Sequence, residues 1–312
     1  MTRLVLTRLG ALLATLLVAS IVIYGALYVA PGDPSTLLAG NKASPKTLEA
    51  IREQWHLDDP IHARYWDWLS GVVRGDLGQS FTYKQSVASL IADRLATTAL
   101  LIGYAFLVTL LVGVLLGVLG ALRPRAGGGI TVLTSICIAT PTYVAAIVLI
   151  TVFAVELGWF PVFGDGEGLP DRLEHLTLPA IALALAWTAF VAQLTKTAVH
   201  EEAEKEHVAT ARSRGLSEAA IVRRHIVRNA MIPITTVLGI TIAGLVAGTV
   251  VIEQSFNLNG IGSLLVQATS SKDFALVQGI SLLLVTIFVV VNVAVDLVNA
   301  ALDPRLRRGS AG

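Results

Sequence analysis

The stretch Thr97–Leu122, TTALLIGYAFLVTLLVGVLLGVLGAL, is apolar almost throughout and contains no charged residue. A helix needs about 20 mostly apolar residues to cross the hydrocarbon core of a bilayer, so this stretch predicts a spanning helix near 96–121. Only helices satisfy their own backbone groups in lipid at such lengths. The sequence therefore predicts an all-α polytopic membrane protein with six transmembrane helices. The other five spans are expected near 8–30, 130–156, 175–198, 231–253 and 275–301.

The composition agrees with a membrane protein and excludes several other classes. Hydrophobic residues make up 54% of the chain and charged residues 14%, whereas soluble domains carry about 25% charged residues. The net charge of +1 gives no field that would attract nucleic acid. The single cysteine, Cys137, permits no internal disulfide, and the histidines show no metal-ligand spacing. Because no GxxxxGKS or GxxxxGKT phosphate loop is present, we expect no catalytic residue, metal or cofactor in this chain.

The basic residues predict the orientation of the spans. They gather near the N-terminus, at Arg123 and Arg125, in 196–228 and at 305–308, all on one side of a six-span arrangement. Positive charge marks the cytoplasmic side, so both termini are expected inside and 31–95 outside. The first apolar run is longer than the about 7–15 residues of a signal-peptide core, and we interpret it as a membrane helix.

The segment 31–95 is expected to contain two helices of its own. Ser44 and Pro45 predict the start of one, and IHARYWDWLSGVV, at 61–73, predicts the other. Such helices can lie in the membrane interface. Two interpretations stay open, a lid over the ends of the spans and a docking surface for an external partner.

The charged connection EHVATARSRGLSEAAIVRRHIVRNAMIP, at 206–233, separates the fourth and fifth spans. Gly215 predicts a left-handed end to one short helix, and Ser217 predicts the cap of the next. Pro233 suits the start of the fifth span better than a helix interior. Cytoplasmic connections are basic in general, so this one can be an ordinary connector. Two short helices joined at a small residue are also consistent with a docking site for a soluble partner.

This connection resembles the EAA coupling loop of ATP-binding cassette importer permeases, in the form of the dipeptide/oligopeptide (peptide/nickel) family. The likeness extends along the chain, through VAPGDP, LDDPIHARYWDWLSGVVRGDLGQSF, GTVVIEQSFNLNGIGSLLVQA and DLVNAALDPRLR. It implies the type I importer permease fold in a first-permease subunit. On this basis 1–30 holds the first span, 31–95 is extracytoplasmic, and 96–312 is the core domain with a coupling loop at 199–230.

The resemblance also implies residue roles in coupling. Ala209, Thr210 and Ala211 fall on the Glu-Ala-Ala positions, with alanine in place of glutamate, while Gly215 and Pro233 match the glycine and the later proline of the loop. The small residues would allow close approach of a partner, and arginines would supply polar contacts. The full coupling set is Glu206, Ala209, Thr210, Ala211, Arg212, Arg214, Gly215, Arg223, Arg224, Arg228 and Pro233.

A second set of residues lies inside the predicted spans. Pro141 predicts a kink in the third span, and Gly244 and Gly248 form a GxxxG pair that favours close helix packing. Glu253 is read either as part of an outer gate or as a solvated end residue. On the last span, Asn292 and Asp296 share one face and suit interhelical hydrogen bonds or gating.

The resemblance thus implies a non-enzymatic permease subunit of a dipeptide or oligopeptide importer in the bacterial cytoplasmic (inner) membrane, forming half of the translocation path. The resemblance implies three kinds of protein partner besides lipid: a homologous second permease, ATPase subunits that bind ATP and Mg, and an extracytoplasmic solute-binding protein. Nickel, glutathione or another small solute stays open as the substrate. An ion-coupled secondary transporter is the rival class, but the centres of these spans lack the buried charges that such proteins tend to carry.

Overall fold

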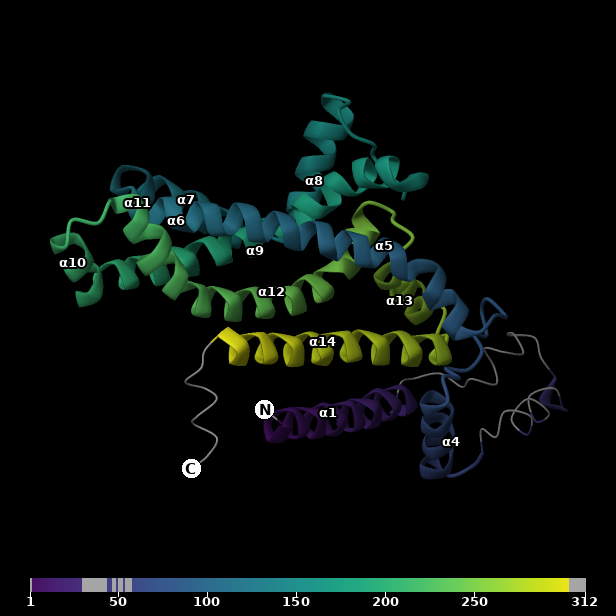
Figure 1. The fold of residues 1–312 in the computed structure, drawn as a ribbon. Coiled ribbons are helices and arrows are strands. Elements are labelled where there is room, and N and C mark those ends of the chain that lie inside the picture. Colours follow the sequence, from purple (N-terminus) through teal and green to yellow (C-terminus); the bar gives the residue numbers. More distant parts are fainter. Residues whose placement is uncertain (1, 30–43, 47–48, 50–52, 54–57, 303–312) are drawn as a thin grey trace. The chain divides into compact units, whose positions relative to one another are not determined.

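The computed structural model describes residues 2–29, 44–46, 49, 53 and 58–302 (Figure 1). In these residues the only β pairing is an isolated bridge between Gln79 and Ser86, and helices dominate. The chain forms two compact units. Unit 1 comprises Met1–Val5, Thr97–Asn259 and Val290–Gly312, and unit 2 comprises Leu6–Ala96 and Gly260–Val289.

Unit 2 contains most of the segment predicted to lie outside the membrane. The predicted helix at 61–73 is confirmed as α4 (Ile61–Val73), whereas most of the one predicted after Ser44 lies outside the described residues. The Asp273 carboxylate is buried and accepts hydrogen bonds from the Ser80 hydroxyl (2.6 Å) and the Thr82 amide (3.0 Å). The loop before α5 is thereby tied to the start of α14. The other helices of unit 2 are most of α1 (Thr2–Val29), the start of α5 (Val87–Val108), α13 (Ile261–Ser270) and the first part of α14 (Phe274–Leu302).

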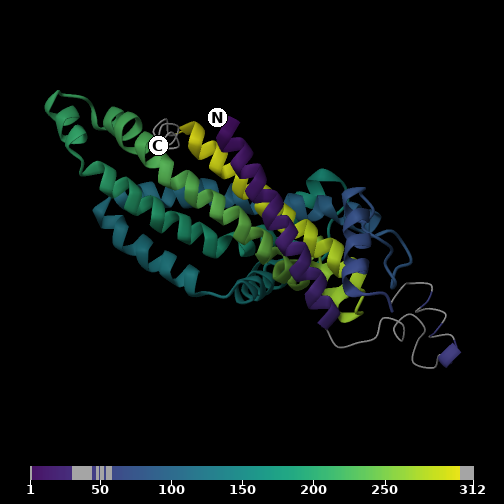
Figure 2. The same ribbon diagram turned by 90° about the horizontal axis from the view of Figure 1, so that it is seen from below.

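Unit 1 is organised around α9 (Gly168–Ala203), a helix of 36 residues. At about 1.5 Å per residue it is about 54 Å long. It packs against α6, α7, α8 and α12, and α12 runs beside it in both views (Figures 1 and 2). The other helices of unit 1 are the rest of α5, η1 (Thr109–Gly113), α6 (Val114–Leu122), α7 (Pro124–Ala139), α8 (Thr142–Leu149), η2 (Ile150–Glu156), α10 (Glu206–Ser213), α11 (Glu218–Ile221), η3 (Val222–Val227), α12 (Arg228–Ser255) and the end of α14; η1, η2 and η3 are π-helices.

Glycines set the spacing between α9 and its neighbours. A Cβ atom added to Gly117 on α6 would overlap Thr195 of α9, and one added to Gly244 on α12 would overlap the indole of Trp187. At Gly248 it would lie 2.7 Å from the Cδ1 of Leu183. Gly117 forms a GxxxG pair with Gly113, whose added Cβ atom would lie 3.0 Å from the Thr188 carbonyl oxygen on α9. The pair Gly113 and Gly117 and the pair Gly244 and Gly248 therefore both approach α9 closely, as expected of small residues in membrane proteins.

The described residues contain five helices that are long and apolar enough to cross a membrane, and a bent helix pair that would make a sixth span. That pair corrects the prediction for Pro141. We expected a kink inside one helix, but the helix ends at Ala139, a new one begins at Thr142, and the two axes differ by 102°. Thr140 and Pro141 are both extended, because proline disfavours the helical conformation of the residue before it.

The prediction for Pro233 is also wrong, in the opposite sense. It lies inside α12, and one helical path runs from Glu218 to Ser255. Proline removes one backbone hydrogen bond, but membrane helices tolerate this where neighbouring helices and local adjustments satisfy the backbone. The same helical path also contains the π-helix η3, which ends at Val227, before α12 begins.

Candidate functional site

The connection between α9 and α12, residues 204–227, forms a turn of two short helices that we call the elbow. α10 and α11 stand at the end of α9, away from α8 (Figure 1). Gly215 has a φ of +75°, and the Leu216 amide donates to the Ala211 carbonyl (3.3 Å). The predicted left-handed glycine stop is thus confirmed. Ser217 occupies the predicted cap position, but its side chain makes no capping hydrogen bond.

The outer face of the elbow is basic and exposed. Arg212 on α10 pairs with Glu218 on α11, with its Nε 2.8 Å and its Nη2 3.3 Å from the two carboxylate oxygens. Glu218 raises the pKa of the Arg212 guanidinium above its ordinary value. Both side chains are about half exposed or more, so the pair adds little stability but holds the guanidinium in place. The other exposed residues of the predicted coupling set are Glu206, Ala209, Thr210, Arg214, Gly215, Arg223, Arg224, Arg228 and Pro233.

The inner face of the elbow packs on the chain itself, and this corrects the expectation for Ala211. Its side chain is only 4% exposed and belongs to an apolar cluster with Val208 of α10, Ile221 of α11 and Ile226 of η3. Val208 and Ala211 are three residues apart and so share one helix face. Ala211 therefore supports the elbow from within, while Ala209 and Thr210 are left on the surface.

A buried carboxylate, Glu202, lies where the elbow joins the two long helices, and it was not among the predicted site residues. Its side chain is 8% exposed and forms an ion pair with Lys205. It also accepts a hydrogen bond from the Asn229 amide (3.0 Å) and lies 3.3 Å from the Nε2 of His207. In the sequence this residue is one of several acids in HEEAEKEH, and nothing there distinguishes the buried one.

The remaining intramembrane predictions have different outcomes. Glu253 is fully buried and accepts a hydrogen bond from the Thr98 hydroxyl (2.6 Å), so the interpretation as a solvated end residue is wrong. Asn292 is half-buried on α14. Asp296 lies on the same helix, but its side chain is outside the described residues, and its role stays a prediction. Within the described residues, no group of three His, Cys, Asp or Glu side chains could hold a metal ion.

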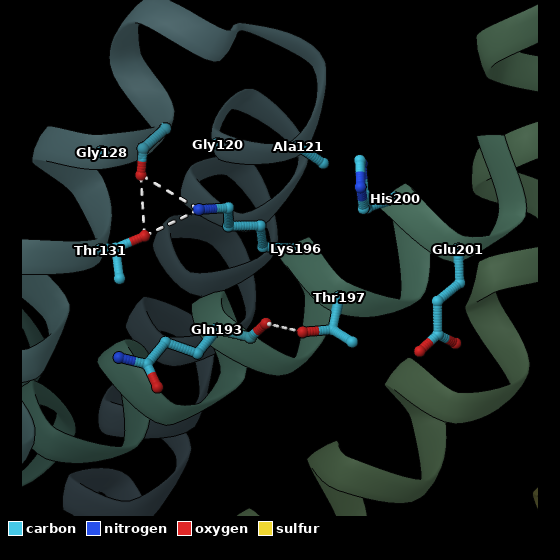
Figure 3. Close-up of a pocket in the computed structure, with 10 residues that line it drawn as sticks. Gly120, Ala121, Gly128, Thr131, Gln193, Lys196, Thr197, His200 and Glu201 are labelled. Atoms are coloured by element: carbon cyan, nitrogen blue, oxygen red, sulfur yellow. Dashed lines mark hydrogen bonds between the residues drawn. The ribbon is translucent and has the colours of Figure 1, made fainter. Parts of the chain in front are cut away.

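A cavity of about 610 Å³ lies between the α6–α7 turn and α9 (Figure 3). The Lys196 ammonium points from α9 towards α7, where it donates to the Thr131 hydroxyl (2.7 Å) and the Gly127 carbonyl (3.1 Å). The lysine therefore ties α7 to α9. The cavity is lined by Gly120, Ala121, Gly127, Gly128, Thr131, Gln193, Lys196, Thr197, His200 and Glu201.

Comparison with known proteins agrees with this arrangement. Residues 110–308 match the family described as "Binding-protein-dependent transport system inner membrane component", and residues 1–102 match the N-terminal family of the same systems. The inward-facing MetNI methionine ABC transporter has a similar fold, with a TM-score of 0.52 and 19% identity over 70% of this chain and 96% of that chain.

Two relatives match along almost their whole length. One, from Brucella abortus (strain 2308), is provisionally named a peptide transport system permease protein and is 38% identical over 98% of this chain and 99% of its own. The other, the glutathione transport system permease protein GsiC of Escherichia coli (strain K12), is 33% identical over 97% of this chain and 98% of its own. The chain belongs to the family of binding-protein-dependent transport system inner membrane components. It is the permease subunit of an ATP-binding cassette importer, a multi-pass protein with the type I fold.

Proposed function

We propose that the elbow is the surface that the importer's ATPase subunits grip, and that the imported solute is a short peptide. One observation supports the coupling role of the elbow. The helical path Glu218–Ser255 begins in the elbow and also qualifies as a membrane span. Its 38 residues extend about 57 Å, whereas the hydrocarbon core is about 30 Å thick. A displacement of the elbow is therefore passed directly to a helix inside the membrane.

The distribution of residues on the elbow supports a docking role. The inner face is held by its own apolar cluster, so the elbow keeps its shape without a partner. The outer face combines small side chains, Ala209 and Thr210, with exposed arginines. Small residues permit close approach, and arginine suits polar contacts with a partner protein. On this proposal the elbow lies in the cytoplasm, as do both termini.

Each partner of the permease then has its own role. A second, homologous permease completes the translocation path, ATPase subunits bind ATP and Mg, and an extracytoplasmic protein delivers the solute. This chain supplies half of the path and binds no nucleotide. The peptide assignment follows the two relatives, since the name of one refers to peptide and that of the other to glutathione, which is itself a tripeptide. Dipeptides and oligopeptides are the first candidates, with glutathione and nickel as alternatives.

The coupling role is tested by a matched pair of glycine variants. Gly215 and Gly158 both have a positive φ, +75° and +62°, and a Cβ atom would meet nothing within 4 Å at either position. Valine therefore imposes a similar backbone cost of about 1–2 kcal/mol at both, but only Gly215 lies in the elbow. Each variant is assembled with its partner subunits in proteoliposomes, and ATPase retention and solute uptake are measured.

We expect Gly215→Val to lose ATPase subunits and uptake, and Gly158→Val to retain the ATPase subunits. Equal retention and wild-type uptake in Gly215→Val would show that the elbow is only a connector. The substrate is tested in the same vesicles with labelled dipeptide, longer peptide, glutathione and Ni²⁺. Uptake by this chain alone, driven by a proton gradient, would instead support a secondary transporter.

A further inference from the structure

Glu202 lies at the junction of three segments that must keep a fixed geometry if the elbow is to move the spans. It is in the last turn of α9, Lys205 precedes α10, His207 is in α10, and Asn229 is in the first turn of α12. Each of these three partners donates to, or lies within ion-pair distance of, the Glu202 carboxylate. Asn229 also donates to the His225 carbonyl (2.8 Å), so the contact extends into η3.

The contacts of Glu202 with Lys205, His207 and Asn229, which we call the polar junction, are directional, whereas those of the apolar cluster beneath it are not. Apolar contacts have no preferred direction, so Val208, Ala211 and Ile226 hold the elbow on the long helices through packing alone. Hydrogen bonds are directional. The Glu202 carboxylate is buried, whereas its partners Lys205, His207 and Asn229 are exposed at the rim, and a buried acceptor left without its donors is costly. A buried carboxylate is weak evidence for stability as such, since apolar replacements of buried ion pairs are often neutral or stabilising.

We propose that Glu202 is a positioning residue that sets the orientation of the elbow on α9 and α12, and so determines how much ATPase movement reaches the membrane helices. This inference rests on the coupling role proposed above for the elbow. Removing the carboxylate leaves the elbow folded on its apolar cluster but able to turn. The assembled importer then hydrolyses ATP while moving less solute.

The test compares four variants in the fully assembled transporter. Glu202→Ala removes the junction, Glu202→Leu keeps its volume without hydrogen bonds, and Glu202→Gln keeps an acceptor for Asn229 but not the charge. Glu204→Ala is the control, because that neighbouring carboxylate is 71% exposed and lies 3.4 Å from the Nε2 of His200, which is itself exposed. The measured quantity is solute transported per ATP hydrolysed, which a loss of folded protein would not change.

We expect this ratio to fall about tenfold in Glu202→Ala and Glu202→Leu, within the range of coupling between sites in proteins. Glu202→Gln should fall between these and the wild type, and Glu204→Ala should match the wild type. A wild-type ratio in Glu202→Leu would mean that volume alone is needed and would overturn the proposal.

Elbow orientation is measured separately, by the distance between spin labels at Ser213 on α10 and Leu194 on α9 in a Cys137→Ala background. Both labelled positions are exposed. We expect a narrow distribution of distances that broadens in Glu202→Leu, and an unchanged distribution would overturn the proposal.

The variant Gly215→Val distinguishes the positioning role of Glu202 from the coupling role of the elbow. If it abolishes uptake while Glu202→Ala keeps the wild-type ratio, the elbow couples and Glu202 does not position it. If neither variant affects uptake, the coupling role itself fails.

Discussion

The contact between Gly244 and Trp187 provides a sharp test of how closely α12 approaches α9. A Cβ atom on Gly244 would overlap Cζ2 and Cη2 of the indole and lie 2.6 Å from Cε2. The ring is rigid, so either the indole or a helix must move. Such overpacking typically costs about 1–3 kcal/mol, and we expect Gly244→Ala to lower the free energy of unfolding by that amount.

Alanine substitutions at two other glycines provide a reference for the loss in free energy of unfolding. At Gly248 the nearest atom is the flexible end of Leu183, which can turn aside, so Gly248→Ala should cost less than Gly244→Ala. At Gly103 a Cβ atom would meet nothing within 4 Å, and alanine should be neutral or stabilising by up to about 1 kcal/mol through helix propensity. Unfolding is followed in micelles by pulse proteolysis along a titration with dodecyl sulfate.

A rescue makes the test specific to this contact. Trp187→Leu removes the atoms that the new methyl group would overlap, so Gly244→Ala should cost less in that background. The expected interaction energy is about 1–3 kcal/mol in a double-mutant cycle. If Gly244→Ala is as stable as Gly103→Ala, or if Trp187→Leu gives no rescue, the close packing of α12 on α9 is wrong.

Further predictions concern topology, the external segment and nucleotide chemistry. In a Cys137→Ser background, an impermeant thiol reagent on intact cells should label Gly75→Cys and spare Gly215→Cys; labelling of the second from outside would reverse the orientation. Asp273→Ala should remove the buried acceptor of Ser80 and destabilise the loop before α5 by about 1.5–3 kcal/mol, seen as faster amide exchange there, whereas unchanged exchange would show that the loop is held by other contacts. The purified chain should hydrolyse no ATP until ATPase subunits are added, and hydrolysis by the chain alone would contradict its role as a permease.

The apolar pattern predicted the class of fold and most of the spans, because membrane helices follow from length and hydropathy alone. The helix at 61–73 and the left-handed Gly215 were also predictable, since both depend on neighbouring residues in the sequence. The ends of the spans were less predictable. α9 and α12 each continue beyond the expected apolar core, because helices do not end where lipid ends.

The two prolines show where local sequence ceases to decide. Pro141 separates two helices and Pro233 does not, although both lie within stretches expected to span the membrane. The outcome depends on whether the surrounding helices and backbone can satisfy the interrupted turn. The burial of two acidic residues could not be predicted for a similar reason. Glu253 and Glu202 are buried by partners far away along the chain, Thr98 and Asn229 respectively, and a single sequence does not reveal such pairs.

The π-helix η1 changes how the sequence of this region should be aligned. In an unbroken α-helix, Ala105 and Gly117 would lie about 120° apart around the axis, because twelve residues at about 100° each overshoot three full turns. A π-turn accommodates one extra residue, which reduces the offset to about 20°. Both positions are buried on unit 1. A one-codon deletion between Thr109 and Gly113 would therefore convert η1 to α-helix and keep both faces directed inwards, because the eleven residues that then separate the two positions also give an offset of about 20°. A relative without the bulge should likewise carry a single-residue gap in the middle of a transmembrane helix rather than in a loop.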